Sequence, residues 1–298
     1  MGIMLILCLI WGLQQVVLKA AASDISPLLQ IALRSGVAAL LVGLLIAWRG
    51  ERMTWQDGTW RPGLLVGILF ALEFLLVGEG LRFTSASHMV VLLYTAPIFV
   101  AISLHWKLPA ERLALPQWLG VALAFGGIVV TFAGKEEASS SYSDVLWGDL
   151  LALLAGVAWA ATTVAVRLSS LARAPAAQTL LYQLVAAFML LTPAAVVLGQ
   201  AEIAPTPLAW GSLLFQSIVV SFASYLTWFW LLRHYLASRL GIFSFMTPLF
   251  GVVMGVGLLD ERMENDFLIG SIMVCSGIIL VSGHGWFRAY LDIFFRKT

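Results

Sequence analysis

Ten apolar runs of about twenty residues each constrain the fold of this chain more than any other feature. They lie near residues 3–20, 28–48, 63–81, 86–105, 116–133, 147–168, 177–199, 210–233, 239–259 and 267–285. A helix needs roughly 20 apolar residues to cross about 30 Å of hydrocarbon. The chain is also 61% hydrophobic and only 11% charged, whereas a soluble domain averages about 45–50% and about 25%. We therefore predict an all-α polytopic membrane protein with ten transmembrane helices.

Charge and cysteine usage exclude several classes of function. The net charge of +1 gives no indication of a nucleic-acid partner. Cys8 and Cys275 both lie inside apolar runs, which argues against a disulfide framework or a thiolate metal site. The sequence has no His-Glu-x-x-His, no cluster of histidines and no phosphate-binding G-x-x-x-x-G-K-[ST] loop. We expect no catalytic residues, no metal and no cofactor.

The distribution of Lys and Arg predicts the orientation of the chain in the membrane. If the N-terminus is cytoplasmic, the outside loops hold Lys19, Arg82, Lys135 and Arg262, and Arg34 lies within the second span. The remaining twelve of the 17 Lys and Arg residues then lie at inside ends and loops. Cytoplasmic loops carry an excess of these residues, so both termini are expected in the cytoplasm. No basic residue precedes the first run, so we interpret that run as a retained span.

The chain contains an internal repeat. A shift of 148 residues superposes Trp11 on Trp159, and a shift of 151 superposes Pro97 on Pro248. Each copy holds five spans, and because five is odd the second copy must enter the membrane from the opposite side. Inverted repeats of this kind are typical of secondary transporters. The predicted division is listed here: a first repeat at 1–133, an extracytoplasmic linker at 134–146, a second repeat at 147–285 and a cytoplasmic tail at 286–298.

A Glu-Arg pair marks the junction between the fourth and fifth spans of each copy. The two stretches read "AERLALPQWLGVALAFGG" and "DERMENDFLIGSIMVCSG", and in both a glycine follows the Glu after nine residues and another after seven more. A carboxylate is favoured in the first turn of a helix by the helix dipole, so we expect Glu111 and Glu261 to begin the fifth and tenth helices. The glycines are expected to allow close helix packing.

These two stretches, with an early Trp-Gly or Trp-Ala in each half, resemble the EamA family of the drug/metabolite transporter superfamily over nearly the whole chain. The resemblance implies ten helices in two inverted bundles of five and the export of small metabolites by alternating access. It also implies a location in the inner (plasma) membrane. Within the family, the many aromatic residues resemble those of the YddG-type exporters of aromatic amino acids.

Aromatic residues related by the repeat are candidates for the wall of a central cavity. Residues equivalent by the pseudo-twofold symmetry can face each other across its axis, and aromatic walls suit apolar or aromatic solutes and amines. The alternative is that these rings face lipid or pack between helices. The candidate pairs are Trp11 with Trp159, Phe74 with Tyr225, and Tyr94 with Phe245.

Polar residues beside these rings could orient a substrate. Gln14 and Thr163 lie close to the two tryptophans in the sequence. His88 and Thr95 are seven residues apart, a spacing that predicts one face of a single helix. Polar groups in the membrane are costly and tend to face a cavity, although a structural role for His88 remains open.

Pro97 and Pro248 fall in the middle of equivalent spans. Proline removes one backbone hydrogen bond and clashes with the preceding turn. Broken helices often mark the substrate site of a transporter, so we predict a hinge at both positions, with a simple packing kink as the alternative.

Glu73 lies near the middle of the third span, and Arg34 lies in the second. An ionisable residue inside the membrane indicates function by default. We therefore interpret Glu73 as a candidate site for proton coupling or for binding the amine of a substrate. The alternative is a structural ion pair between Glu73 and Arg34. Glu79 is expected either to line the mouth of the site or to pair with Arg82.

The sequence thus predicts a secondary transporter that exports small metabolites, most simply amino acids with aromatic or apolar side chains. Alternatives are an exporter of other organic solutes or cationic drugs, a channel, and an intramembrane enzyme. A channel would need a charged ring or filter loop, and an enzyme would need a nucleophile–base pair or a metal cluster. The expected partners are a small-molecule substrate and the lipid bilayer, without nucleic acid, and a monomer is compatible with the sequence.

Overall fold

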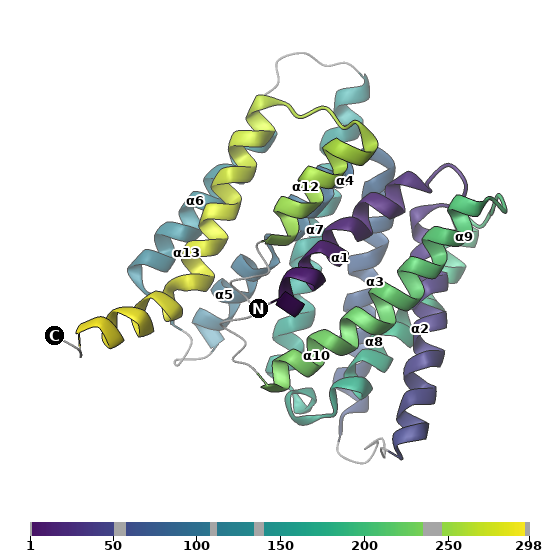
Figure 1. Cartoon of the computed structure of the whole chain (residues 1–298), viewed down its shortest axis with the longest axis horizontal. Coiled ribbons are helices and arrows are strands. Elements are labelled where there is room, and N and C mark those ends of the chain that lie inside the picture. Colours follow the sequence, from purple (N-terminus) through teal and green to yellow (C-terminus); the bar gives the residue numbers. More distant parts are fainter. Residues whose placement is uncertain (1, 51–57, 108–111, 134–139, 235–245, 296–298) are drawn as a thin grey trace.

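The computed structural model describes residues 2–50, 58–107, 112–133, 140–234 and 246–295, and it is built from helices (Figure 1). The elements of the first half are α1 (Gly2–Ala20), α2 (Pro27–Arg49), α3 (Trp60–Phe83), α4 (Ala86–Leu93), α5 (Ala96–Lys107) and α6 (Leu115–Ala133). Those of the second half are α7 (Ser140–Arg167), the short 3-10 helix η2 (Ser170–Arg173), α8 (Ala176–Val197), α9 (Pro207–Leu214), the π-helix η3 (Phe215–Ser224), α10 (Tyr225–His234), α12 (Met246–Leu259) and α13 (Asn265–Phe295).

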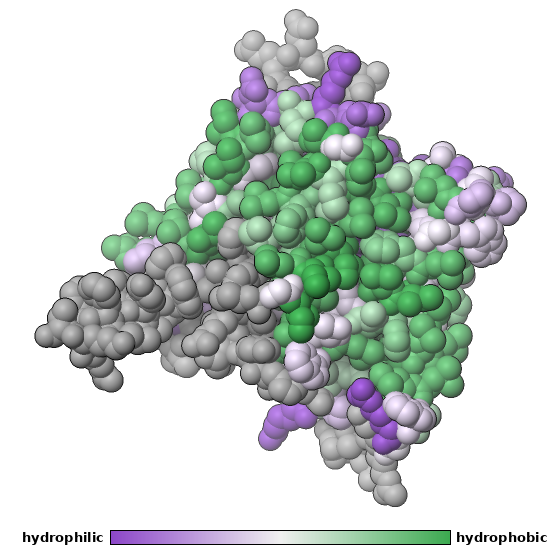
Figure 2. Space-filling view, viewed as in Figure 1, coloured by the Kyte–Doolittle hydropathy of each residue, from purple (hydrophilic) through white to green (hydrophobic). Residues whose placement is uncertain are grey.

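Seven helices among the described residues are long and apolar enough to cross a membrane, and three shorter apolar helices accompany them. Many large apolar side chains are exposed, among them Leu40, Leu44 and Val253. Figure 2 shows that hydrophobic residues cover the middle of the molecule and that hydrophilic ones gather toward two opposite ends. The fold is therefore that of an all-α polytopic membrane protein, as the sequence predicts.

Local sequence signals explain several helix boundaries. The hydroxyl of Ser26 accepts a hydrogen bond from the backbone nitrogen of Leu29, and Pro27 occupies the first turn of α2. Gly50 ends the same helix in the left-handed conformation, with φ of 65°. Side-chain caps at the start and left-handed glycines at the end are common helix boundaries. Ser85 and Thr206 cap α4 and α9 in the same way.

The two ends of the bundle carry different elements. The end that we call the Lys19 face holds the C-terminal ends of α1 and α3 and the N-terminal ends of α4 and α9 (Figure 1). The opposite end, the Arg167 face, holds the C-terminal ends of α2 and α7 and the N-terminal end of α3. The equivalent helices α1 and α7 thus run in opposite directions, as an inverted repeat requires.

The glycine spacing has a direct packing consequence. Helices α6 and α13 lie side by side (Figure 1), and a Cβ added to Gly127 would lie 2.6 Å from the carbonyl oxygen of Gly270. A Cβ added to Gly120 would lie 2.9 Å from the carbonyl oxygen of Gly277. Only glycine allows the backbones to approach this closely. The predicted role of these four glycines is confirmed.

The expectation for the Glu-Arg pair is wrong in its detail. Helix α13 begins at Asn265, four residues after Glu261, so Glu261 is not in its first turn. Its carboxylate instead accepts hydrogen bonds from the backbone nitrogens of Ala86 and Ser87, at 2.7 and 3.0 Å. Glu261 therefore caps α4, a helix of the other copy. Glu111 lies outside the described residues.

Two element boundaries also differ from the predicted ones. Helix α7 begins at Ser140, although its apolar run begins near residue 147, and α13 continues to Phe295, beyond the predicted end near residue 285. Both extensions are more polar than the spans themselves. Hydropathy marks the part of a helix that lies in hydrocarbon, and the helix can extend beyond it.

Candidate functional site

A polar connection joins α1, α2 and the π-helix inside the membrane-spanning region. Arg34 of α2 is 1% exposed and donates from Nη1 to Oε1 of Gln216, at 2.5 Å. The Nε2 of Gln216 donates to the backbone oxygen of Gln14 in α1, at 2.9 Å. Both polar atoms of the Gln216 side-chain amide are hydrogen-bonded, so Gln216 fixes the guanidinium of Arg34 relative to α1.

A second polar contact runs parallel to the first, one turn nearer the Lys19 face. The hydroxyl of Ser212 donates to Oε1 of Gln30 at 2.5 Å. The Nε2 of Gln30 donates to the backbone oxygens of Leu18 and Ile25. Gln30 and Arg34 are four residues apart, as are Ser212 and Gln216, so each pair lies on one helix face. These two sets of hydrogen bonds connect α1 and α2 to the eighth span, which consists of α9, η3 and α10.

The π-helix η3 was not predicted from the apolar run at 210–233. Its buried residues are Gln216, Ser217, Val220, Ser221 and Ser224. Four of these five side chains are polar, and they face the interior of an otherwise apolar span. π-Helical turns are rare and occur frequently at functional sites. The sequence analysis missed this buried polar face.

Several buried polar atoms near these elements have no hydrogen-bond partner among the described residues. They are Gln15 Oε1 on α1, Arg34 Nε on α2, Glu73 Oε2 on α3, and the hydroxyls of Ser217 and Ser221 on η3. A buried polar atom without a partner is costly, and more so away from water. The concentration of such atoms on four adjoining elements indicates groups that a bound ligand could satisfy.

Arg34 and Glu73 interact electrostatically but form no ion pair in the described part of the chain. The guanidinium carbon of Arg34 instead lies 4.7 Å from the centre of the Phe74 ring. Phe74 in turn packs edge-to-face against Phe70, with 4.7 Å between ring centres. The geometry therefore does not support the alternative of a structural ion pair between Arg34 and Glu73.

The aromatic candidates lie in the interior but do not pair as the repeat suggested. Trp11 packs edge-to-face on Trp228 at 5.5 Å and donates from Nε1 to the hydroxyl of Ser224 at 2.9 Å. Trp159 packs edge-to-face on Tyr94 at 5.1 Å. Trp11 and Trp159 thus each meet a different ring.

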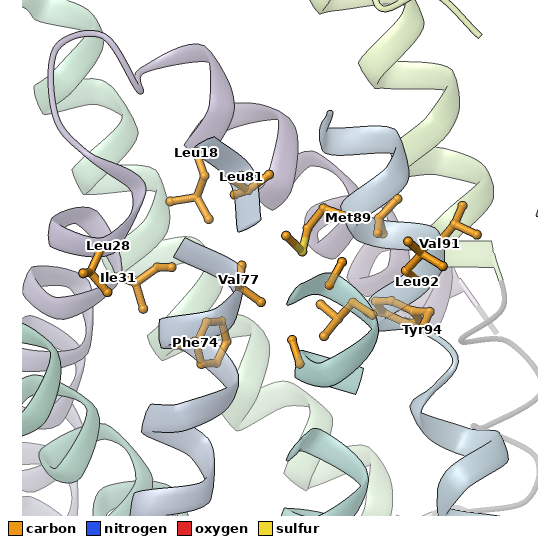
Figure 3. Close-up of a cluster of buried hydrophobic side chains, with 14 of the residues drawn as sticks. Leu18, Leu28, Ile31, Phe74, Val77, Leu81, Met89, Val91, Leu92 and Tyr94 are labelled. Atoms are coloured by element: carbon orange, nitrogen blue, oxygen red, sulfur yellow. The ribbon is translucent and has the colours of Figure 1, made fainter. Parts of the chain in front are cut away.

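Phe74 and Tyr94 belong to one buried cluster, and in Figure 3 Phe74 lies between Leu28 and Tyr94. Tyr225 packs against the edge of the same cluster. Phe245 lies outside the described residues. The structure therefore brings Phe74, Tyr94, Trp159 and Tyr225 to a common core, with Trp11 in a neighbouring cluster.

The expectation that His88 and Thr95 share one helix face is wrong. Helix α4 ends at Leu93, and Thr95 lies in the break before α5, where its hydroxyl donates to the backbone oxygen of Leu92 at 2.6 Å. The break precedes Pro97, which occupies the first turn of α5. Proline has no backbone N–H to donate to the carbonyl four residues earlier and clashes with it, and that carbonyl belongs to Leu93, the last residue of α4. Pro248 likewise lies in the first turn of α12.

The hydroxyl of Thr163 is occupied within its own helix. It donates to the backbone oxygen of Trp159 at 3.0 Å, one turn earlier in α7. Gln14 is buried, and its backbone oxygen is the group that meets Gln216. Gln14 thus contacts Gln216 through its backbone, whereas the hydroxyl of Thr163 bonds only within its own helix.

His88 has a partner that the sequence analysis missed. Its Nδ1 lies 3.0 and 2.9 Å from the two carboxylate oxygens of Asp149 in α7, and Asp149 is 2% exposed. Thr84 donates its hydroxyl to the same carboxylate at 2.5 Å. The imidazole also stacks on the ring of Phe267, with 3.7 Å between centres. This cluster joins the two copies near the Lys19 face.

Comparison with known proteins identifies the family. The model of the EamA-like transporter family matches residues 1–133 and 146–283, which includes both copies of the repeat. The chain belongs to the EamA-like transporter family.

Relatives of this EamA-like transporter match it over most of their length. An uncharacterised transporter, YoaV, of Bacillus subtilis is 26% identical over 273 residues, which are 91% of this chain and 92% of the relative. A probable amino-acid metabolite efflux pump of Escherichia coli is 26% identical over 297 residues, 96% of this chain and 95% of the relative. A solved structure aligns with a TM-score of 0.66 at 20% identity, covers 93% of this chain and 94% of its own, and supports the fold.

Membership of the family defines the broad activity of this EamA-like transporter. It is a membrane protein of a class that moves small molecules, and transporters are generally not enzymes. The described residues contain no group of three His, Cys, Asp or Glu side chains that could hold a metal ion. Arg34 and Gln216, joined by a hydrogen bond, form a buried polar layer together with Glu73 of the adjoining helix α3.

Proposed function

We propose that this protein is a secondary transporter that exports amino acids with aromatic or apolar side chains by alternating access. The observation that carries the proposal is the family match over both copies of the repeat. The inverted repeat supplies two equivalent halves, and rocking of such halves about a central site is the usual mechanism of alternating access. The name of the Escherichia coli relative supports amino acids as the class of solute.

The aromatic and polar side chains of the interior support the choice of solute. Tyr94, Trp159 and Phe74 would contact an aromatic or apolar side chain by stacking and by burial of apolar area. Arg34, Glu73 and Gln216 lie in adjoining elements and would contact its polar groups. These six residues belong to the proposed site, and its other members are Trp11, Gln14, His88, Thr95, Thr163, Tyr225 and Phe245. Pro97 and Pro248 are its proposed hinges.

The proposed location is the inner membrane, with the Arg167 face in the cytoplasm. The support is the excess of Lys and Arg at the predicted inside ends. With this orientation, the contacts of Glu261, His88 and Lys19 lie on the outside. Lys19 Nζ adds to them by donating to the backbone oxygens of Leu81 and Thr84, at 2.5 and 2.9 Å. These contacts hold the outer ends together, so the structure is best interpreted as closed on that side.

Transport by the purified protein in liposomes tests the proposal. Liposomes loaded with an unlabelled amino acid should accumulate the same labelled amino acid by counterflow, and aromatic amino acids should exchange fastest. Cationic drugs and nucleosides serve as the competing solute classes. Exchange of cationic drugs without exchange of amino acids would support the alternative function, and flux without counterflow would indicate a channel.

A further inference from the structure

Two opposite charges lie at similar depth in the bundle. Arg34 is the eighth residue of α2, and Glu73 is the eleventh from the end of α3. At about 1.5 Å per residue, both lie roughly 10–15 Å from the Lys19 face. They are 1% and 5% exposed, respectively. A buried charge needs a partner of the opposite charge, yet these two form no ion pair with each other in the described part of the chain.

Arg34 is held in position but keeps hydrogen-bonding capacity. Gln216 accepts from Nη1, and the Phe74 ring lies under the guanidinium. Both contacts fix the plane of the side chain, while Nε has no hydrogen-bond partner within the described segments. A planar guanidinium presents adjacent N–H groups that match a carboxylate. The free capacity of Arg34 therefore suits a carboxylate ligand.

Glu73 offers the complementary group. Its Oε2 is buried and has no hydrogen-bond partner in the part of the chain that the structure describes. A carboxylate only accepts hydrogen bonds, so the ligand group that satisfies it must be a donor, and an ammonium group adds an opposite charge. Glu73 precedes Phe74 in the sequence, so the carboxylate and the ring under Arg34 come from the same turn of α3.

We propose that Arg34 and Glu73 recognise the two charges of a zwitterionic amino acid, with Arg34 binding the carboxylate and Glu73 the ammonium group. The inference rests on the proposed transport function, because alternating access must open the buried layer to solute. A zwitterion adds no net charge to this layer and supplies a counter-charge to each residue. A ligand with a single charge would leave one of the two residues without a counter-charge, which is costly away from water. Ser217 and Ser221, whose hydroxyls have no partner, are further groups that could contact the ligand.

Ligands with one charge removed test this assignment without altering the protein. Binding to the full-length protein in detergent is measured for L-phenylalanine, for phenethylamine, which has only the ammonium group, and for 3-phenylpropionate, which has only the carboxylate. We expect L-phenylalanine to bind at least tenfold more tightly than either analogue, since each analogue lacks one of the two charge-assisted hydrogen bonds. Equal binding of the three ligands, within a factor of about three, would overturn the proposal.

Two variants then assign the charges to the residues. Arg34→Gln should weaken binding of L-phenylalanine at least tenfold and leave phenethylamine binding unchanged or tighter. Glu73→Gln should weaken L-phenylalanine equally but leave 3-phenylpropionate unchanged or tighter. The matched control is Glu79→Gln on the same helix, because Glu79 is paired with Arg82 at 2.8 Å and should not affect any of the three ligands.

The remaining outcomes separate this inference from the transport proposal. The inference is wrong, and the two residues are structural, if both single variants weaken the binding of all three ligands equally. It is also wrong if the double variant, with Arg34→Gln and Glu73→Gln together, keeps the wild-type preference for L-phenylalanine over the two analogues. If amino acids exchange in liposomes but binding shows no preference for the zwitterion, the transport function stands without this site. If the zwitterion preference is present but no amino acid is moved, the site stands and the transport proposal fails.

Discussion

The carboxylate of Glu261 accepts hydrogen bonds from both the backbone nitrogen and the hydroxyl of Ser87, at 3.0 and 2.5 Å. With the bond from Ala86, it completes the N-terminal cap of α4 from a segment 174 residues away. The cap therefore fixes the second copy of the repeat to the first at the Lys19 face. Its loss should both shorten α4 and loosen this closure.

We expect Glu261→Ala to lower the free energy of unfolding by about 1–2 kcal/mol, because lost caps typically cost this much. Thermal unfolding in detergent measures the change. Glu261→Gln keeps one acceptor oxygen and should cost less. Arg262→Ala, at the exposed neighbouring residue, is the control. Equal unfolding temperatures for Glu261→Ala and Arg262→Ala would show that the cap contributes nothing.

The contact between α6 and α13 allows a test at two neighbouring glycines. A Cβ at Gly127 would lie 2.6 Å from a backbone oxygen, whereas the atom nearest a Cβ at Gly126 would be the flexible Met273 Cε, at 3.2 Å. Backbone cannot move aside as a methionine can. We expect Gly127→Ala to destabilise the protein by about 1–3 kcal/mol and Gly126→Ala to have little effect, measured by thermal unfolding. A larger effect at Gly126 would contradict the helix pairing.

Sequence reasoning predicted the parts of this molecule that depend on local composition. Apolar runs fixed most spans, and the spacing of Gly120 and Gly127 identified a close helix contact. The partner of Glu261 was missed because it lies in the other copy, and no local pattern encodes such a distance. Gln216 was overlooked because the π-helix that turns its polar residues inward has no strong sequence signal. Asp149 was overlooked because a single carboxylate near a span end usually faces water.

The His88–Asp149 pair should behave as a coupled unit. Asp149→Asn or His88→Gln alone leaves a buried partner without its hydrogen-bonding counterpart, which typically costs about 1–3 kcal/mol. The double variant removes both and should be less destabilised than the sum of the single variants. A double-mutant cycle by thermal unfolding measures the coupling. Strict additivity would show that the two residues act independently.

The orientation of the bundle can be tested with single cysteines. In a background of Cys8→Ala and Cys275→Ala, Ser23→Cys lies on the Lys19 face and Ala172→Cys on the Arg167 face, and both positions are exposed. A membrane-impermeant thiol reagent should label Ser23→Cys in intact cells. It should label Ala172→Cys only after permeabilisation. The reverse pattern would contradict the cytoplasmic placement of the Arg167 face.

The last prediction concerns the choice of side chain by the transporter. Tyr94 and Trp159 meet edge-to-face at 5.1 Å, Tyr94 in the buried core and Trp159 partly buried against it, so they could contact the side chain of a solute. Contacts between aromatic rings are worth about 0.5–1.5 kcal/mol beyond the buried area. We therefore expect Trp159→Ala and Tyr94→Ala to slow the exchange of aromatic amino acids about tenfold and that of small aliphatic ones much less.

The control for these variants is Trp210→Ala, because Trp210 is 52% exposed. This substitution removes a similar side-chain volume from the surface and leaves the core unchanged. Counterflow in liposomes, normalised to the amount of folded protein, gives the ratio of aromatic to aliphatic exchange for each variant. A changed ratio at Tyr94 and Trp159, with a normal ratio at Trp210, supports direct contact with the solute. An unchanged ratio in all three variants would remove both residues from the site, because a packing defect alone slows every solute alike.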